Sequence, residues 1–149
     1  MRAVVQRVRT ASVAVADEVV GRIDLGLLVY VGAMRGDGDT DLDYVAQKVV
    51  GLRIFEDDVG KMSRGVLDVG GSILLIPQFT LFGDVRRGRR PSFDDAELPE
   101  RAAELFERLR AKVEALGPSV RTGRFRAEML VSGEVLGPVT ILLDSRKLF

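Results

Sequence analysis

The segment from Arg2 to Val15 is dense in β-branched residues, and apolar positions there nearly alternate with other types. This pattern favours β-strands that bury one face. We therefore expect two short strands in this segment, followed by a turn at Ala16 and Asp17.

Two short apolar runs have the length of buried strands. The run from Leu25 to Val31 lies beside Gly26 and Gly32, and the run from Ser72 to Ile76 follows a glycine pair. Continuous apolar runs bounded by turn residues are typical of strands buried on both faces. Further strands are expected at Arg53–Phe55, from about Val120, from about Met129, and at Val139–Leu143.

Two longer segments have helical periodicity. The first can be capped by Thr40 and precedes the strand expected at Arg53, and the second begins near Pro99 and ends before Gly117 and Pro118. Apolar residues recur at helical spacing and predict one inward stripe on each helix. These residues are Leu42, Val45, Ala46, Val49 and Val50 in the first helix, and Leu105, Phe106, Leu109, Val113 and Leu116 in the second.

Many short strands with two long helices indicate an α+β fold. We expect mainly antiparallel or mixed β-sheets, barrel-like in form, with the two principal helices packed against them. The chain has 149 residues, of which 46% are hydrophobic and 30% charged, and it contains no linker or repeat. Residues 1–149 are therefore expected to form a single domain.

The charge balance limits the partners of this protein. The 22 Lys and Arg residues match the 22 Asp and Glu residues, so no global positive field is available to hold a long nucleic acid. Any contact with RNA must be local. The sequence has neither a membrane-spanning apolar run nor the apolar core of a signal peptide, so we expect a cytoplasmic protein without membrane association.

The chain contains no Cys and no His. These absences exclude thiol nucleophiles, Ser-His-Asp triads and zinc held by His or Cys. No side chain has an unperturbed pKa near 7. A hydrolase built from these residues must use a carboxylate, Lys or Tyr with a shifted pKa, backbone hydrogen bonds, or a group of the substrate itself.

Several separate motifs occur in one order along the chain. They are Arg2–Val8 with Ala11, Ser12 and Val13; Arg53–Phe55; Gly60–Met62; Pro77–Leu81; Arg90–Phe93; Thr122–Phe125; and Gly137–Thr140. Together they resemble the D-aminoacyl-tRNA deacylases, also known as D-tyrosyl-tRNA(Tyr) deacylases, nearly from end to end. The resemblance implies an enzyme that hydrolyses the ester between a D-amino acid and the 3′ end of tRNA, a proofreading reaction.

The resemblance also implies a homodimer with two equivalent active sites at the subunit interface. Gln78, Phe79 and Thr80 line the pocket in that family. In that family the peptide bond between Gly137 and Pro138 is cis and reaches into the pocket of the partner subunit. Its carbonyls sterically exclude the side chain of an L-amino acid. Arg7 matches the residue that supports this loop. Glycyl-tRNA, which has no side chain to refuse, is an expected second substrate.

An aminoacyl ester is an activated acyl group, so its hydrolysis needs mainly orientation and stabilisation of the oxyanion. Backbone N–H groups just past a strand end can serve, and the candidates are those of Gln78, Phe79 and Thr80, since Pro77 has none. The Thr80 hydroxyl is an alternative nucleophile, although no His is present to activate it. The 2′-hydroxyl of the terminal adenosine can instead assist the water, and no metal or other cofactor is required.

Two further groups are candidates for contacts with RNA. Arg86, Arg87, Arg89 and Arg90 form the one dense basic cluster and are candidates for phosphate contacts, although such a cluster also suits a solvated surface. Phe125 and Met129 can flank the terminal adenine, or they can belong to the core. Phe79 by itself would also suit a core position.

Pro77 stands where the family motif usually begins with Ser. A related branch that removes L-alanine from tRNA begins this motif with Pro, but it has a small residue where this chain has Phe79. Val135 and Leu136 replace residues that are polar in many relatives. The alternatives are therefore a deacylase of the L-alanyl-tRNA branch and a non-catalytic dimer that binds RNA ends.

Overall fold

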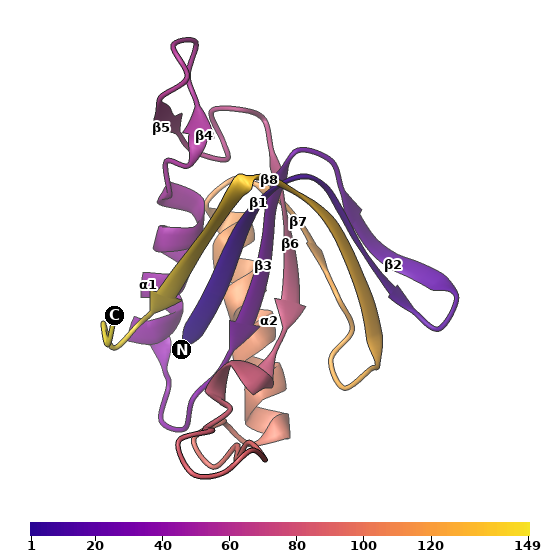
Figure 1. Ribbon diagram of the computed structural model, residues 1–149, viewed down its shortest axis with the longest axis vertical. Helices are drawn as coiled ribbons and strands as arrows, with labels where there is room; N and C mark the ends of the chain where they lie inside the picture. The colour runs from indigo at the N-terminus through magenta and orange to yellow at the C-terminus, as the bar shows by residue number, and fades with distance from the viewer.

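The computed structural model describes residues 1–149, and six of its strands form one strongly bent mixed sheet (Figure 1). These strands are β1 (Arg2–Val15), β2 (Glu18–Ile23), β3 (Gly26–Gly32), β6 (Ser72–Pro77), β7 (Ser119–Thr122) and β8 (Met129–Asp144). Their order is β2-β1-β3-β6-β7, and β8 pairs with the other side of β1. The pairs β3–β6 and β6–β7 are parallel, and the other pairs of this sheet are antiparallel.

Two helices, α1 (Asp39–Gly51) and α2 (Pro99–Ala115), pack side by side against one face of the sheet (Figure 1). A small hairpin of β4 (Phe55–Glu56) and β5 (Met62–Arg64) projects beyond α1. The predicted α+β fold with a mixed sheet and two principal helices is confirmed. The expected strand at Arg53–Phe55 is wrong in its bounds, because only Phe55 of that triplet pairs, with Arg64.

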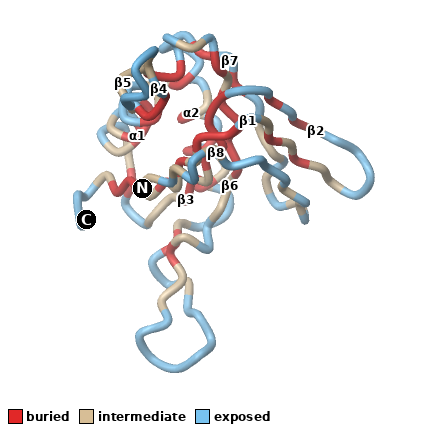
Figure 2. The backbone as a smooth tube through the Cα atoms, turned by 45° about the horizontal axis from the view of Figure 1, so that its top comes forward, coloured by how far each residue is buried: buried red, intermediate tan, exposed pale blue.

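The central strands β3 and β6 are buried on both faces, as their apolar runs predicted (Figure 2). Leu27 and Ile73 belong to the large core between the sheet and the helices, whereas Leu28 and Leu74 belong to a second core on the opposite face. Successive residues of a strand point to opposite faces, so both cores share the same two strands. The sheet is therefore the middle layer of the molecule.

Strand β1 is one strand of 14 residues, and the expectation of two short strands is wrong. Its first half pairs with β3 and its second half with β2, while β8 runs along its other side. Pairing with β8 is irregular between Gln6 and Ala11, and such bulges bend a strand without ending it. Strand β8 also continues through this irregular stretch as one strand, and the expectation of two separate strands there is wrong.

The bent sheet nearly closes on itself where β2 folds over β6 and β7. Gly21 of β2 makes this approach possible, because a Cβ there would lie 2.9 Å from the Thr122 carbonyl oxygen and 3.2 Å from Leu74 Cδ1. The closure gives the barrel-like form that the sequence predicted.

Both helices keep their predicted stripes with small changes at the ends. Helix α1 begins at Asp39 after Gly38 instead of being capped by Thr40, because the Asp41 carboxylate accepts a hydrogen bond from the Gly38 N–H at 2.9 Å. The expected burial of Leu116 is wrong, since this residue caps the C-terminus of α2 just after Ala115 and is 42% exposed. Neither α1 nor α2 has the length and apolar composition of a membrane-spanning helix.

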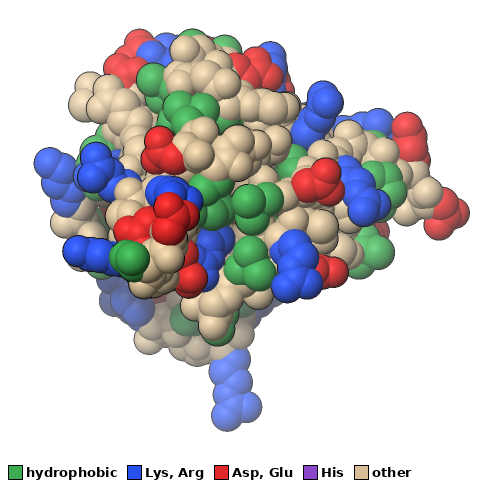
Figure 3. All heavy atoms as spheres, turned by 90° about the horizontal axis from the view of Figure 1, so that it is seen from above, with side chains coloured by type: hydrophobic (Ala, Val, Ile, Leu, Met, Phe, Trp, Pro, Cys, Tyr) green, Lys and Arg blue, Asp and Glu red, His purple; other side chains and the backbone are tan.

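Acidic and basic side chains are interspersed on the end of the molecule that carries β4 and β5 (Figure 3). This face shows no continuous patch of one sign, in keeping with the balanced charge of the chain.

Candidate active site

The site begins where β6 ends. Pro77 is the last residue of β6 and pairs with Val31, and the short 3-10 helix η1 (Phe79–Phe82) follows. The Gln78 N–H donates to the Val31 carbonyl at 2.7 Å, so it is already used to hold the strand end. The first N–H groups of a short helix have no partner inside that helix. Of the three backbone N–H groups expected as oxyanion donors, those of Phe79 and Thr80 therefore remain as candidates.

The side chains of this motif lie at the surface. Phe79 is 55% exposed, and its ring packs edge-on against Phe93, with 5.0 Å between ring centroids. A core role for Phe79 is therefore excluded. The Thr80 hydroxyl is hydrogen-bonded to the Gln78 side-chain amide, which is not a base. The structure thus places no proton acceptor beside this hydroxyl that could activate it as a nucleophile.

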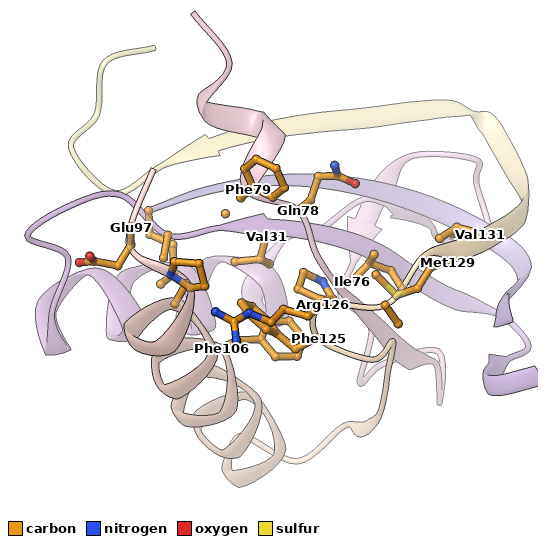
Figure 4. Close-up of a pocket in the computed structure, with 17 residues that line it drawn as sticks. Val31, Ile76, Gln78, Phe79, Glu97, Phe106, Phe125, Arg126, Met129 and Val131 are labelled. Atoms are coloured by element: carbon orange, nitrogen blue, oxygen red, sulfur yellow. The ribbon is translucent and has the colours of Figure 1, made fainter. Parts of the chain in front are cut away.

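Gln78 and Phe79 stand over a pocket of about 420 Å³ between the sheet and the start of α2 (Figure 4). This volume lies within the usual range for small-molecule sites. Phe125 and Met129, expected either beside a bound adenine or in the core, line the same pocket. The lining residues are Met1, Val31, Gly32, Ala33, Ile76, Pro77, Gln78, Phe79, Glu97, Pro99, Ala102, Phe106, Phe125, Arg126, Ala127, Met129 and Val131.

Gly137 and Pro138 do not line this pocket. They lie exposed on β8, where the strand separates from β1, and the peptide bond between them is cis. Gly137 has a φ of 116°, in the region that favours glycine. One protomer therefore does not bring this loop together with its own Gln78 and Phe79.

Arg7 contacts this β8 loop from the interior of the fold. Its side chain is almost fully buried and donates to the carbonyls of Leu136 at 3.4 Å and Ile54 at 2.8 Å. Glu56 lies 3.6 Å from the guanidinium and partly balances its charge. Arg7 thus contacts the residue before Gly137, and its supporting role stays a prediction.

The basic cluster occupies an exposed loop between η1 and α2 that projects from the body (Figure 2). Two backbone hydrogen bonds between Asp84 and Ser92 close its base. Arg86 pairs with Asp84, whose pKa is lowered to about 2 by hydrogen bonds from the Arg86 side chain and backbone. The other three arginines of the cluster, Arg87, Arg89 and Arg90, form no ion pair.

Three residues at the site were not assigned to it from the sequence. Arg2 donates to the Leu81 carbonyl of η1 at 3.1 Å and so ties the motif to β1. Phe106 had been assigned to the core stripe of α2, yet it also forms pocket wall. Arg126 had no sequence signal of its own, because its role depends on which loop the fold brings to the pocket.

The profile of the D-Tyr-tRNA(Tyr) deacylase family matches residues 4–144. The chain belongs to this family. A D-aminoacyl-tRNA deacylase of Sorangium cellulosum (strain So ce56) is 58% identical over 150 residues, covering all of both chains, and one of Desulfitobacterium hafniense (strain DSM 10664 / DCB-2) is 56% identical over 149 residues, again covering both. The family resemblance and the class of enzyme, a hydrolase, are confirmed.

Solved structures of similar shape agree with this membership. The c-Myc DNA unwinding element binding protein superposes with a TM-score of 0.92 at 37% identity, covering 97% of this chain and 98% of that one. A probable eukaryotic D-amino acid tRNA deacylase superposes with a TM-score of 0.82 at 21% identity, covering 95% and 97%. The second likeness concerns the fold alone.

Proposed function

We propose that this deacylase cleaves the ester bond of D-aminoacyl-tRNA, releasing the D-amino acid and free tRNA in the cytoplasm as a proofreading step. The observation that carries the proposal is the placement of Gln78 and Phe79 at a strand end over a mainly apolar pocket that Phe125 and Met129 also line. A strand end supplies backbone donors, and aromatic and thioether side chains suit the flat face of an adenine.

The chemistry rests on the backbone and on the substrate. The N–H groups of Phe79 and Thr80 would stabilise the negative charge that develops on the carbonyl oxygen as water attacks. The bond from the carbonyl carbon to the ribose 3′-oxygen then breaks, and that oxygen takes up a proton. With no His or Cys in the chain, we assign the orientation of water and the proton transfer to the adjacent 2′-hydroxyl of the substrate.

We propose that two copies of the chain form a homodimer in which each pocket receives the Gly137–Pro138 loop of the partner. The loop is exposed and lies outside its own pocket, as a donated segment would be. Three apolar residues are exposed at separate points along β8 and are candidates for contacts in such a dimer, namely Leu130, Val135 and Leu142. The loop carbonyls would exclude an L side chain and accept a D-amino acid or glycine.

The arginine loop is proposed to contact the phosphates of the tRNA. Arg87, Arg89 and Arg90 are exposed and unpaired, so they are free to bind phosphate, whereas Arg86 must first leave Asp84. Local contacts of this kind suit a protein whose net charge is zero.

A second candidate function is removal of L-alanine from tRNA, favoured by Pro77 at the start of the motif. Pro77 lines the pocket, so the difference from Ser lies where substrate would bind. The retained Phe79 favours the D-specific reaction.

Matched D-, L- and glycyl-tRNAs test these assignments. Release of D-amino acid and glycine with L-aminoacyl-tRNA intact supports the proposal. Release of L-alanine supports the second candidate, and binding of tRNA without release of any amino acid would contradict both.

A further inference from the structure

The pocket contains one basic side chain, that of Arg126, among the residues that line it. Arg126 lies in the loop between β7 and β8, and its guanidinium reaches toward α2 beside the rings of Phe106 and Phe125 (Figure 4). Its φ is 60°, a left-handed conformation that few residues other than glycine adopt. The loop thus directs a cation to the edge of an otherwise mainly apolar pocket.

Arg126 is held there by Glu100 in the first turn of α2. The distance from Arg126 Nη2 to Glu100 Oε1 is 2.7 Å, and the two side chains are 60% and 78% exposed. The hydrogen bond from Arg126 lowers the pKa of Glu100, so Glu100 is ionised at neutral pH. Exposed pairs of this kind contribute little stability, so a better anionic ligand can displace the carboxylate.

A phosphate group is such a ligand, because a guanidinium binds two of its oxygens at once. The proposed function places an adenine between Phe125 and Met129, and the phosphate nearest to that base is the 5′-phosphate of the same nucleotide. We propose that Arg126 binds the 5′-phosphate of the 3′-terminal adenosine, and that Glu100 holds the guanidinium in place while the pocket is empty. This inference rests on the proposed function for the source of the nucleotide and for the position of its adenine.

The two residues have opposite effects on this binding. Arg126→Gln removes the cation and is expected to weaken binding of adenosine 5′-monophosphate about tenfold, the usual loss for a charge-assisted hydrogen bond. Glu100→Gln removes the competing anion and is expected to strengthen it about two- to threefold. Neither change should alter binding of adenosine, which has no phosphate.

Isothermal titration of the full-length protein with adenosine 5′-monophosphate and with adenosine tests the proposal. Arg124→Gln is the matched control, because Arg124 is exposed in the same loop, does not line the pocket, and has the same charge. The preference for the monophosphate over adenosine should be lost in Arg126→Gln, enlarged in Glu100→Gln and unchanged in Arg124→Gln.

An equal affinity for the two ligands, no binding of the monophosphate at millimolar concentration, or an unchanged preference in Arg126→Gln would overturn the proposal. A short RNA ending in cytidine-cytidine-adenosine identifies the source of the phosphate. If it fails to compete with the monophosphate, the assignment to an RNA terminus is wrong. These titrations need no turnover, so their outcome is separate from that of the deacylation assay.

Discussion

The two signature segments of this chain differ in how the fold treats them. The Pro77–Leu81 segment follows a central strand and is tied down by the Val31 carbonyl and by Arg2, and it stands over a formed pocket. The Gly137–Thr140 segment lies on an outer strand, and its first two residues are exposed and outside that pocket. The first segment therefore borders a pocket of its own protomer, whereas Gly137 and Pro138 lie outside that pocket.

The difference is what we expect if, as proposed above, the site is divided between two copies of the chain. Arg7 donates one hydrogen bond to the β8 loop, at the Leu136 carbonyl, and a second to the Ile54 carbonyl, although residues 136–138 do not line the pocket of their own protomer. A loop that is held in place but does not line its own pocket is expected where it completes the pocket of a partner subunit. The pocket segment would then perform the chemistry, and the loop would select the substrate.

The largest effect is expected from the substrate. A D-aminoacyl-tRNA that ends in 2′-deoxyadenosine should bind normally and be cleaved at least about a hundredfold more slowly, because it lacks the hydroxyl assigned to proton transfer. Single-turnover rates at saturating enzyme measure this directly. A normal rate of cleavage would contradict the assignment of proton transfer to the 2′-hydroxyl and would point instead to a side chain near η1.

Gly137→Ala tests the loop. A Cβ at this position would lie 2.8 Å from Val139 Cγ2 and 3.0 Å from the Val139 nitrogen, and φ is 116°. We expect a loss of about 1–2 kcal/mol in unfolding free energy and a fall of at least about tenfold in kcat/KM, since a small displacement of a positioning element is costly.

Thermal denaturation and kinetics on the same Gly137→Ala preparation separate the two effects. The change is expected to affect stability as well as activity, and the matched control is Gly51→Ala, where a Cβ meets nothing within 4 Å. Full activity in a destabilised Gly137→Ala protein would mean that the loop has only a structural role, as a turn.

Replacing Arg87 and Arg89 by Ala should raise KM several-fold and reduce the slope of log KM against log salt by about 1 for each phosphate that is no longer neutralised. Arg86→Ala should have a smaller effect, because Arg86 is already paired with Asp84. Steady-state kinetics over a range of salt concentrations provide the slopes. Identical slopes in all variants would leave this loop as solvated surface.

Thr80→Ala is expected to have the smallest effect, a change in kcat of less than about threefold, because Ala keeps the backbone N–H and removes only a hydroxyl that faces the Gln78 amide. Single-turnover rates with an unmodified substrate check this. Loss of cleavage together with a normal rate on the 2′-deoxy substrate would make Thr80 the nucleophile or proton relay.

Local pattern predicted the elements that are uniform along their length. The continuous apolar run of β3 and the stripe around Leu105 and Leu109 in α2 are signals of burial that require no knowledge of the partner. The continuity of β1 and β8 was missed, because the bulges between Gln6 and Ala11 are a property of the pairing and not of either sequence alone.

The site was predicted in the same uneven way. The resemblance directed attention to Gln78 and Phe79, and the structure places both over a pocket that Phe125 and Met129 also line. The pair of Arg126 and Glu100 joins residues 26 positions apart, and only the fold brings such residues together. The hydrogen bond from the Gln78 N–H to the Val31 carbonyl likewise depends on the tertiary structure and could not be predicted from the local sequence.

Subunit complementation tests the proposed division of the site between two protomers most directly. Phe79→Ala damages the pocket and Pro138→Ala damages the loop, so each homodimer is expected to be nearly inactive. A dimer containing one protomer of each kind has one site with both defects and one intact site. After subunit exchange between equal amounts, verified by native mass spectrometry, deacylation should recover to about a quarter of the wild-type rate. Exchanged dimers with no more activity than the two separate variants would contradict the account.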